Sequence, residues 1–436
     1  MIVSNEEQFS EFINRWDIED LFVDVVYSCV EKHPANNKIS AILVQFVSGD
    51  SYVLPFNHND CTNLNIDLIG KMYKSTSVKF CVEKKNILVS GLRFQNLIDL
   101  KLRNYINIGE VVDSVKWLTP AHDHYYSKST SMNINNSIPI MKHIESFNKL
   151  VGATFQYRIG NHNPFYNDKV PVVLATVESN GLHVNMDKFV GKRKNVTKES
   201  LVHTHYNIYT ATGRPSNAFG GVNYAALGKH DGSRVGFDSR FSGGKLYQYD
   251  YDAFHLRLIA NLINYDLPFE SVHTWFAKQY FGEIDITDEV YDESKKISFT
   301  KLYSNRIDED EDIEFFGKVY TFRKKLWAFA ETNGYIPSPI TARPISLNNI
   351  NDVSESKLFN YLLQLLETEH NISIMYDVIR YMKNMKSKLT LYTYDSFLFD
   401  VHPDELDNMA EIKSLLEESG KYPVKRETGH TYHSIS

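Results

Sequence analysis

The chain has 436 residues, of which 42% are hydrophobic and 23% are charged. These fractions are typical of globular proteins and exclude a chain that is disordered throughout. The length favours two or three domains. The 47 basic and 54 acidic residues leave a net charge of −7, which excludes a uniformly basic nucleic-acid-binding coat but not a local basic groove.

The sequence also argues against a membrane protein and a secreted protein. No apolar run approaches about 18 residues, so no membrane span is predicted. Residues 1–9 lack the basic and apolar regions of a secretory signal. The three cysteines form no CxxC pair, which favours a reducing compartment and argues against a cysteine-built zinc site. We therefore expect a cytoplasmic protein.

The N-terminal part of the chain predicts a small α/β sheet. Apolar runs bounded by turn residues indicate strands, and Gly49-Asp50 indicates a hairpin turn. The Ser- and Asn-rich segment 127–137 predicts a linker, and with it a domain boundary. The predicted elements are a helix at 6–15, a strand at 21–30, a hairpin over 40–56 and mixed strand and helix patterning over 88–118.

Asp250 lies where a predicted strand passes into a predicted helix. The strand is expected over Lys245–Tyr249, and the helix over Phe254–Leu262, where apolar residues recur at helical spacing. The carboxylate can then project from the edge of the sheet, and the Tyr251 carbonyl can point the same way. The alternative is an aspartate that caps the helix, which is the commoner use of such a residue.

A second aspartate, Asp395, lies inside a predicted hairpin over 388–401. Alternating apolar residues favour a strand on each side, and Asp395-Ser396 is a turn pair. The alternative is an aspartate chosen for turn chemistry alone. Two carboxylates brought together on a sheet would suit two magnesium ions, which can clamp the attacking and leaving oxygens of an in-line displacement.

These aspartates belong to an ordered series of motifs over residues 170–436. The series resembles the motifs of the family A DNA polymerases, the type of bacterial DNA polymerase I. Each segment is a weak signal alone, but six in the right order are a specific one. In chain order they are 209–214 (a Thr-x-Thr-Gly-Arg segment), 250–257 (motif A), 293–304 (motif B, the fingers helix), 360–364 (an Asn-x-x-x-Gln pair), 394–396 (motif C) and 422–432 (a closing strand).

The resemblance implies an α+β or α/β chain with a right-hand polymerase. A polymerase domain is expected at 170–436, with a much reduced thumb because only residues 182–209 are left for it. The compact build is typical of a viral member. Within the polymerase domain we expect a palm at 205–262 and 345–436 and fingers at 263–344, preceded by a linker with a connecting helix at 131–169.

The implied activity is template-directed addition of deoxynucleotides to a primer 3′ end in DNA replication, by a two-metal-ion mechanism. Its cofactor would be Mg²⁺, with Mn²⁺ able to substitute. Its partners would be primer–template DNA, dNTPs, and a processivity factor or other replication proteins. The implied metal ligands are Asp250, Asp395 and the Tyr251 carbonyl; the nucleotide-binding residues are His255, His273, Lys295, Phe299 and Tyr303, with Lys295 also catalytic; the DNA-binding residues are Arg214, Asn223, Arg257, Asn360 and Gln364.

Three positions depart from the pattern of the family. Tyr291 stands where motif B usually begins with an arginine, so one cation for the triphosphate is missing. His255 replaces the motif A glutamate that crowds the sugar 2′ position. Ser396 replaces the third acid of motif C. The two aspartates that would bind metal, Asp250 and Asp395, are retained. The sequence leaves undecided how the site would distinguish deoxyribose from ribose and what replaces the role of the third acid.

Residues 1–130 resemble, more weakly, the RNase H-like proofreading exonuclease of the same family. That nuclease needs an Asp-x-Glu pair on its first strand, and here the strand reads Asp24-Val25-Val26. We therefore expect a degenerate, structural domain without exonuclease activity. Two other functions stay open for the whole chain. One is a catalytically inactive nucleic-acid-binding subunit. The other is a single-subunit RNA polymerase, which is consistent with His255 in place of the motif A glutamate.

Overall fold

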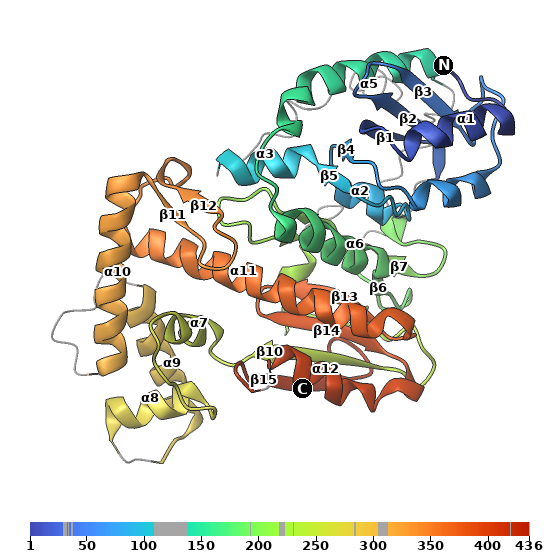
Figure 1. Cartoon of the computed structure of the whole chain (residues 1–436). Helices are drawn as coiled ribbons and strands as arrows, with labels where there is room; N and C mark the ends of the chain where they lie inside the picture. The colour runs from blue at the N-terminus through green and yellow to red at the C-terminus, as the bar shows by residue number, and fades with distance from the viewer. Residues whose placement is uncertain are drawn as a thin grey trace. The chain divides into compact units, whose positions relative to one another are not determined.

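The contacts of the chain divide it into two compact units. In the computed structural model, unit 1 contains Met1–Asn107 and continues to Ser179, and unit 2 contains the chain from Asn180 onward (Figure 1). The described residues are 1–28, 33, 35, 38–108, 138–191, 193–217, 223–229, 231–282, 285–303, 313–418 and 420–435.

Unit 1 is built on a five-stranded sheet in the order β3-β2-β1-β4-β5. The first three strands pair antiparallel, and β4 and β5 continue the sheet in parallel to β1. The strands are β1 (Leu21–Tyr27), β2 (Ile39–Phe46), β3 (Ser51–Pro55), β4 (Lys79–Cys81) and β5 (Leu97–Asp99); the helices are α1 (Glu6–Trp16), η2 (Ile66–Tyr73), α2 (Lys84–Val89), α3 (Leu100–Ile108), α5 (Ile140–Thr154), η5 (Phe155–Arg158), η6 (Phe165–Lys169) and α6 (Val170–Asn180).

Side chains of β1 alternate between two apolar cores, one on each face of the sheet. Val23 and Val25 pack with the apolar face of α1 in one core. Phe22 and Val26 belong to the second core, which contains apolar residues of α5. This alternation is what a strand covered on both faces requires. The predicted helix at 6–15 and the hairpin over 40–56 are confirmed. The predicted strand at 21–30 is confirmed over Leu21–Tyr27, and residues 29–30 lie outside the described residues.

Within the segment 131–169, predicted as a linker with a connecting helix, the structure has helix α5, which packs on the sheet of unit 1. Helix α5 contacts β1 and β2, and Phe147 and Val151 are buried against them. The division between the units falls after Ser179, so unit 2 begins ten residues later than the expected start of the polymerase domain at residue 170. The apolar segment that begins at Val170 is helix α6 and belongs to unit 1. The predictions for 109–118 and 127–137 lie outside the described residues.

Unit 2 contains an antiparallel four-stranded sheet in the order β13-β14-β10-β15. Its strands are β10 (Lys245–Tyr251), β13 (Lys388–Thr393), β14 (Ser396–Val401) and β15 (Val424–Gly429). Three short two-stranded ladders pair β6 (Leu182–His183) with β7 (Leu201–Val202), β8 (Tyr206–Asn207) with β9 (Ser216–Asn217), and β11 (Tyr335–Pro337) with β12 (Pro344–Ser346).

Helices α7, α8, α9, α10 and α11 of unit 2 share one apolar core, which fixes α9 relative to the helices around it. Leu256 of α7, Phe276 of α8, Leu302 of α9 and Phe359 of α11 are all fully buried in it. The helices are α7 (Phe254–Leu262), α8 (Val272–Phe281), α9 (Asp288–Tyr303), α10 (Glu314–Asn333), α11 (Glu355–Tyr381) and α12 (Asn408–Leu416), with short turns η7 (Arg193–Asn195), η8 (Tyr224–Ala226), η9 (Leu347–Asn349), η10 (Met382–Asn384) and η11 (Pro403–Glu405).

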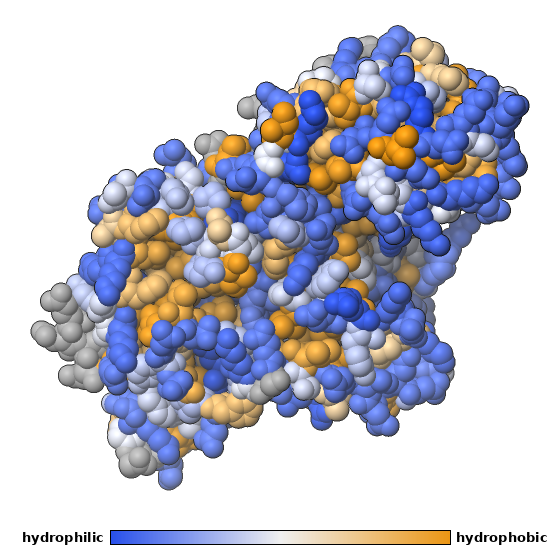
Figure 2. Space-filling view, in the orientation of Figure 1, coloured by the Kyte–Doolittle hydropathy of each residue, from blue (hydrophilic) through white to orange (hydrophobic). Residues whose placement is uncertain are grey.

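The face of the molecule in Figure 2 is largely hydrophilic, with apolar side chains interspersed among polar ones. Among the described residues, no helix has the length and apolar character that crossing a membrane would need.

Candidate active site

A cleft of about 590 Å³ in unit 2 gathers most of the predicted site residues. Its lining comes from β10, the hairpin between β13 and β14, β15, and helices α7, α8, α9 and α11. Of the predicted residues, those that line it are Arg214, Asp250, Tyr251, His255, His273, Lys295, Phe299, Tyr303, Asn360, Gln364 and Asp395.

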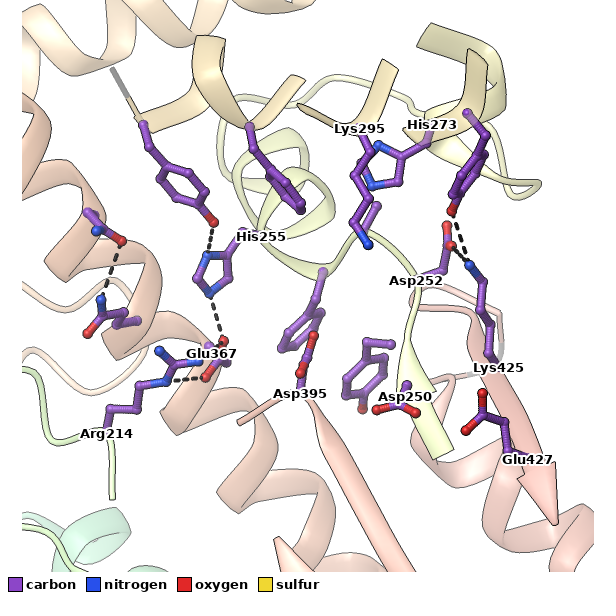
Figure 3. A pocket seen from close by; sticks show the side chains of 18 of the residues that line it. Arg214, Asp250, Asp252, His255, His273, Lys295, Glu367, Asp395, Lys425 and Glu427 are labelled. Atoms are coloured by element: carbon purple, nitrogen blue, oxygen red, sulfur yellow. Dashed lines mark hydrogen bonds and ion pairs between the residues drawn. The ribbon is translucent and has the colours of Figure 1, made fainter. Parts of the chain in front are cut away.

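The pairing of β10 with β14 brings the two aspartates together. Asp250 stands opposite Ser396, the residue that follows Asp395. The Tyr251 amide donates a hydrogen bond to the carbonyl oxygen of Asp395, with 3.1 Å between nitrogen and oxygen. Tyr394 adopts a left-handed conformation, with φ of 56°, in the turn that precedes Asp395. Both carboxylates line the cleft (Figure 3).

The two carboxylates supply oxygen donors of the kind that a divalent cation prefers. Burial, together with the negative charges of Glu367 and Asp250, raises the pKa of Asp395 to about 6. The Gln248 amide donates a hydrogen bond of 2.7 Å to an oxygen of Asp250, which orients that carboxylate. Two oxygen ligands that repel one another in a partly buried cleft are stabilised by a bound cation.

Two cationic side chains also enter the cleft. Lys295 extends into it from α9 and Lys425 from β15 (Figure 3). Lys425 lies 2.9 Å from a carboxylate oxygen of Asp252 and 3.3 Å from the hydroxyl of Tyr291. Burial favours a raised pKa for Asp252, but Lys425 and Arg257 hold it below its usual value.

His273 is a buried, neutral member of the same wall. Its side chain is only 2% exposed, and burial lowers its pKa to about 4. Ser294 of α9 donates a 2.7 Å hydrogen bond to the His273 carbonyl, which fixes α8 against α9. The imidazole lines the cleft, so it can offer a neutral polar contact but no positive charge at neutral pH.

The stripe predicted along α9 faces the cleft. Lys295, Phe299 and Tyr303 follow one another at intervals of four residues and all line it. The rings of Phe299 and Tyr303 are stacked, with centroids 5.8 Å apart. The face of α9 that packs into unit 2 carries different residues: Ser294, Ser298 and Leu302 are fully buried. Phe299 is therefore not on the core-facing side of this helix, whereas Tyr303 lines the cleft and also packs against the core.

Arg214 and the amide pair on α11 lie at another edge of the cleft. Arg214 donates to both carboxylate oxygens of Glu367, at 2.8 and 3.2 Å, and its guanidinium lies 3.8 Å from the centroid of the Tyr394 ring. Gln364 and Asn360 contact each other at 3.4 Å on successive turns of α11. These groups are polar, fixed and open to the cleft.

Two predicted DNA-binding residues do not line the cleft. Arg257 is only 6% exposed and donates to the backbone carbonyls of Asp252, Pro268 and Glu270. A guanidinium that donates to these backbone carbonyls holds the segment before α8 in place. The prediction for Arg257 is therefore replaced by a structural role. Asn223 is exposed and lies outside the lining of the cleft.

Several cleft residues were not predicted from the sequence. They are Lys229, Asp252, Glu367, Lys425 and Glu427. Lys425 was within reach of sequence reasoning, because it belongs to the segment that resembles a closing strand. Only the register of β10 with β15, in which Asp250 faces Lys425, shows that this lysine reaches the aspartate strand. Glu367 lies inside a long helix, and no motif in the neighbouring sequence marks it as a site residue.

Comparisons with known proteins give a likeness in fold. No protein-family model matches the sequence, and no curated protein does. A solved structure described as the POL domain of Pol1 from M. smegmatis, in complex with DNA primer-template and dNTP, matches with a TM-score of 0.73. The identity is 14%, and the match covers 100% of this chain and 100% of that chain. The chain is thus similar in fold to the polymerase domain of a bacterial Pol1.

Proposed function

We propose that the chain is a template-directed DNA polymerase that adds deoxynucleotides to a primer 3′ end. The observation that carries the proposal is the meeting of Asp250 and Asp395 in one cleft, with Lys295 across from them. The fold is similar to that of a POL domain described with DNA primer-template and dNTP. In this proposal, residues 205–262 and 345–436 are the palm and 263–344 the fingers.

Asp250 and Asp395 would hold two magnesium ions, with the Tyr251 carbonyl as a further ligand. Such ions, when bound, stabilise the negative charge that develops on the attacking and leaving oxygens of phosphoryl transfer. The contribution of the chain is to hold the two carboxylates at the ends of paired strands, where the β10–β14 register fixes their spacing. Gln248 keeps the Asp250 carboxylate oriented before any ion arrives.

Lys295 and Lys425 would hold the triphosphate. Both lysines line the cleft, Lys295 from α9 and Lys425 from the strand next to β10. A lysine is a compact charge that pairs with phosphate oxygens, and Lys295 could also supply a proton to the leaving pyrophosphate. Lys425 contacts Tyr291, the position at which the family pattern has an arginine, and thus offers a cation in the region where one is missing from motif B.

The aromatic and amide groups would contact bases. Phe299 and Tyr303 present flat rings to the cleft, suited to the incoming base and the template. Arg214 and Gln364 would reach the minor groove, where acceptors are shared by all base pairs, so they can test pair geometry without reading sequence. Unit 1 would be a degenerate exonuclease-like domain with a structural role.

Primer extension tests the proposal and its alternatives together. A labelled primer–template is incubated with the purified chain and Mg²⁺, with either dNTPs or NTPs, and with EDTA as a control. The proposal expects template-directed extension with dNTPs that EDTA abolishes. Extension mainly with NTPs would favour an RNA polymerase. Binding of primer–template without extension in any condition would favour an inactive nucleic-acid-binding subunit and contradict the proposal.

A further inference from the structure

A loop of unit 1 between β3 and η2 carries three potential metal ligands in the span 58–61. They are His58, Asp60 and Cys61, and one ligand atom of each lies within 4.8 Å of the other two. The Nδ1 atom of His58 lies 2.5 Å from the Oδ1 atom of Asp60. The Cys61 thiol donates to that same oxygen, with 3.4 Å between sulfur and oxygen. A ring nitrogen, a carboxylate oxygen and a sulfur atom therefore meet at one place.

We propose that these three side chains bind one divalent cation of the zinc class, with water in the fourth position. Imidazole, carboxylate and thiolate are the ligand types that Zn²⁺ takes, at about 2.0–2.3 Å from the ion. Two atoms bound to one such ion are therefore at most about 4.5 Å apart, so the three ligand atoms need only small movements to reach it. The site uses a single cysteine rather than a cysteine pair. It belongs to unit 1 and does not depend on the proposed function.

His58 is held in place with one ring nitrogen directed at Asp60. Its side chain is fully buried, and its Nε2 atom has no hydrogen-bond partner among the described residues. Two hydrogen bonds with the Asn63 side chain hold its backbone: the His58 amide donates at 2.8 Å, and its carbonyl accepts at 3.0 Å. The ring of His143 packs against it in a T-shaped arrangement, with centroids 5.9 Å apart. A buried imidazole with an unpartnered nitrogen is costly, and a metal bond at Nδ1 would offset that cost.

Asp60 is held from the opposite side by α5. Its Oδ2 atom accepts a 3.0 Å hydrogen bond from the amide of Ile140, the first residue of that helix. One carboxylate oxygen is thus committed to the helix, while the other faces His58 and Cys61. Outer contacts of this kind commonly orient the carboxylates that bind metals. The Asp60 side chain is 44% exposed, so an ion can enter from solvent and water can complete its coordination.

The exchange of a proton for a cation balances the charge of the site. On binding, the S–H bond of Cys61 breaks, its proton goes to solvent, and the thiolate bonds to the ion. Asp60 contributes a second negative charge, and His58 binds through a lone pair of a neutral ring. The two anionic ligands neutralise a divalent cation. A thiolate and an imidazole also favour Zn²⁺ over Mg²⁺ and Ca²⁺, which take oxygen ligands.

Cobalt spectroscopy tests the site directly, because Co²⁺ bound to a thiolate has a charge-transfer absorption band that Co²⁺ bound only to oxygen lacks. The reduced, chelator-treated chain is titrated with Co²⁺ in excess Mg²⁺, which competes for sites made of carboxylates alone. We expect a single thiolate-bound Co²⁺ per chain, displaced by Zn²⁺. The band should disappear in Cys61→Ala and remain in Cys81→Ala. Cys81 is the matched control, because it is a buried cysteine of β4 outside the cluster.

Thermal unfolding gives a second readout that is independent of catalysis. Zn²⁺ at about 100 times its dissociation constant should raise the melting temperature of the parent chain by about 5 °C or more. Cys61→Ala and Asp60→Asn should lose this shift, and Cys81→Ala should keep it. A parent chain without a thiolate band, or a band and a thermal shift that persist in Cys61→Ala, would overturn the inference. Neither readout involves primer extension, so failure of the proposed function would leave this result standing.

Discussion

Lys425 shows how a single side chain from a distant segment completes one wall of the cleft. Its ammonium group lies between Asp252 and Tyr291, on the same side as Lys295. Replacing it with alanine removes one charge-assisted contact to a triphosphate, which is worth about 1.5–3 kcal/mol. We therefore expect Lys425→Ala to raise KM for dNTP about tenfold or more, with a smaller effect on kcat.

The control for this prediction is Lys421→Ala. Lys421 lies just before the same strand but lines a different cavity, beside Tyr422. Steady-state kinetics on one primer–template should show a normal KM for this variant. Arginine at position 425 should recover much of the loss. A KM in Lys425→Ala equal to that of the parent protein would remove this lysine from the nucleotide site.

Asp24 gives a prediction about stability in unit 1. Burial in β1 raises its pKa to about 6, above the value of about 3.9 in an unfolded chain. The folded state therefore disfavours the ionised form, and this aspartate lowers stability progressively as pH rises from about 4 to about 6. We expect Asp24→Asn to increase the free energy of unfolding at pH 7 by about 1–2 kcal/mol and to have little effect at pH 4.

Urea denaturation at the two pH values measures this difference. The exposed Glu11→Gln variant, from α1 of the same unit, is the control and should match the parent protein at both. Equal stability of Asp24→Asn and the parent protein at pH 7 would show that the carboxylate is solvated in the folded state.

At the scale of elements, the two faces of α9 should give opposite mutant properties. Phe299 faces the cleft, whereas Leu302 is fully buried in the core shared with α7, α8, α10 and α11. Leu302→Ala should cost about 2–5 kcal/mol of stability. Phe299→Ala should leave the melting temperature nearly unchanged and lower kcat/KM for dNTP. Thermal unfolding and primer extension on both variants check this; a strongly destabilised Phe299→Ala would mean that the ring serves packing.

The elements that could be predicted from sequence are those whose signals are local. The β10 strand and α7 helix were placed by the apolar pattern on either side of Asp250, and the structure has them within two residues. Most of the predicted site residues also belong to short local motifs, and they line one cleft. The resemblance to motif A implies a DNA contact for Arg257. The sequence pattern does not show the alternative, because its carbonyl partners, which include Pro268 and Glu270, lie in a loop whose path the pattern does not specify.

Sequence reasoning also missed the extent of unit 1. The sequence predicts a connecting helix within 131–169 but not its packing, in which Phe147 and Val151 of α5 contact the sheet of unit 1. For a helix that follows a polar stretch, the side that packs can be identified only when the sheet that it covers is known. The same holds for Glu367, since its importance lies in contacts with Arg214 and His255, which are more than 100 residues away along the chain.

At the scale of the whole molecule, the proposed enzyme should have low processivity by itself. Residues 182–209, where the family has a thumb, hold only two-residue strands and a short turn among the described residues. Fewer phosphate contacts mean weaker binding that falls steeply with salt. Single-encounter extension with a heparin trap should give short products, which a replication partner would lengthen by tethering. Products hundreds of nucleotides long from the chain alone would contradict this.

Unit 1 should contribute no proofreading. Val26 stands where the resembling nucleases have a metal-binding glutamate on the first strand. Incubation of a single-stranded primer with the chain and Mg²⁺ or Mn²⁺ should leave it intact. Degradation that disappears in Asp24→Ala would show an active exonuclease.

The central claim, that Asp250 and Asp395 hold the metal ions for nucleotidyl transfer, is tested most directly by single-turnover incorporation of one dNTP. The variants are Asp250→Ala and Asp395→Ala, and the control is Asp404→Ala, an exposed aspartate just beyond β14 whose side chain is 71% exposed. Loss of a metal ligand should slow incorporation at least about a thousandfold, with primer–template affinity largely kept. The control should react at the parental rate. Near-parental incorporation by either cleft variant would contradict the account.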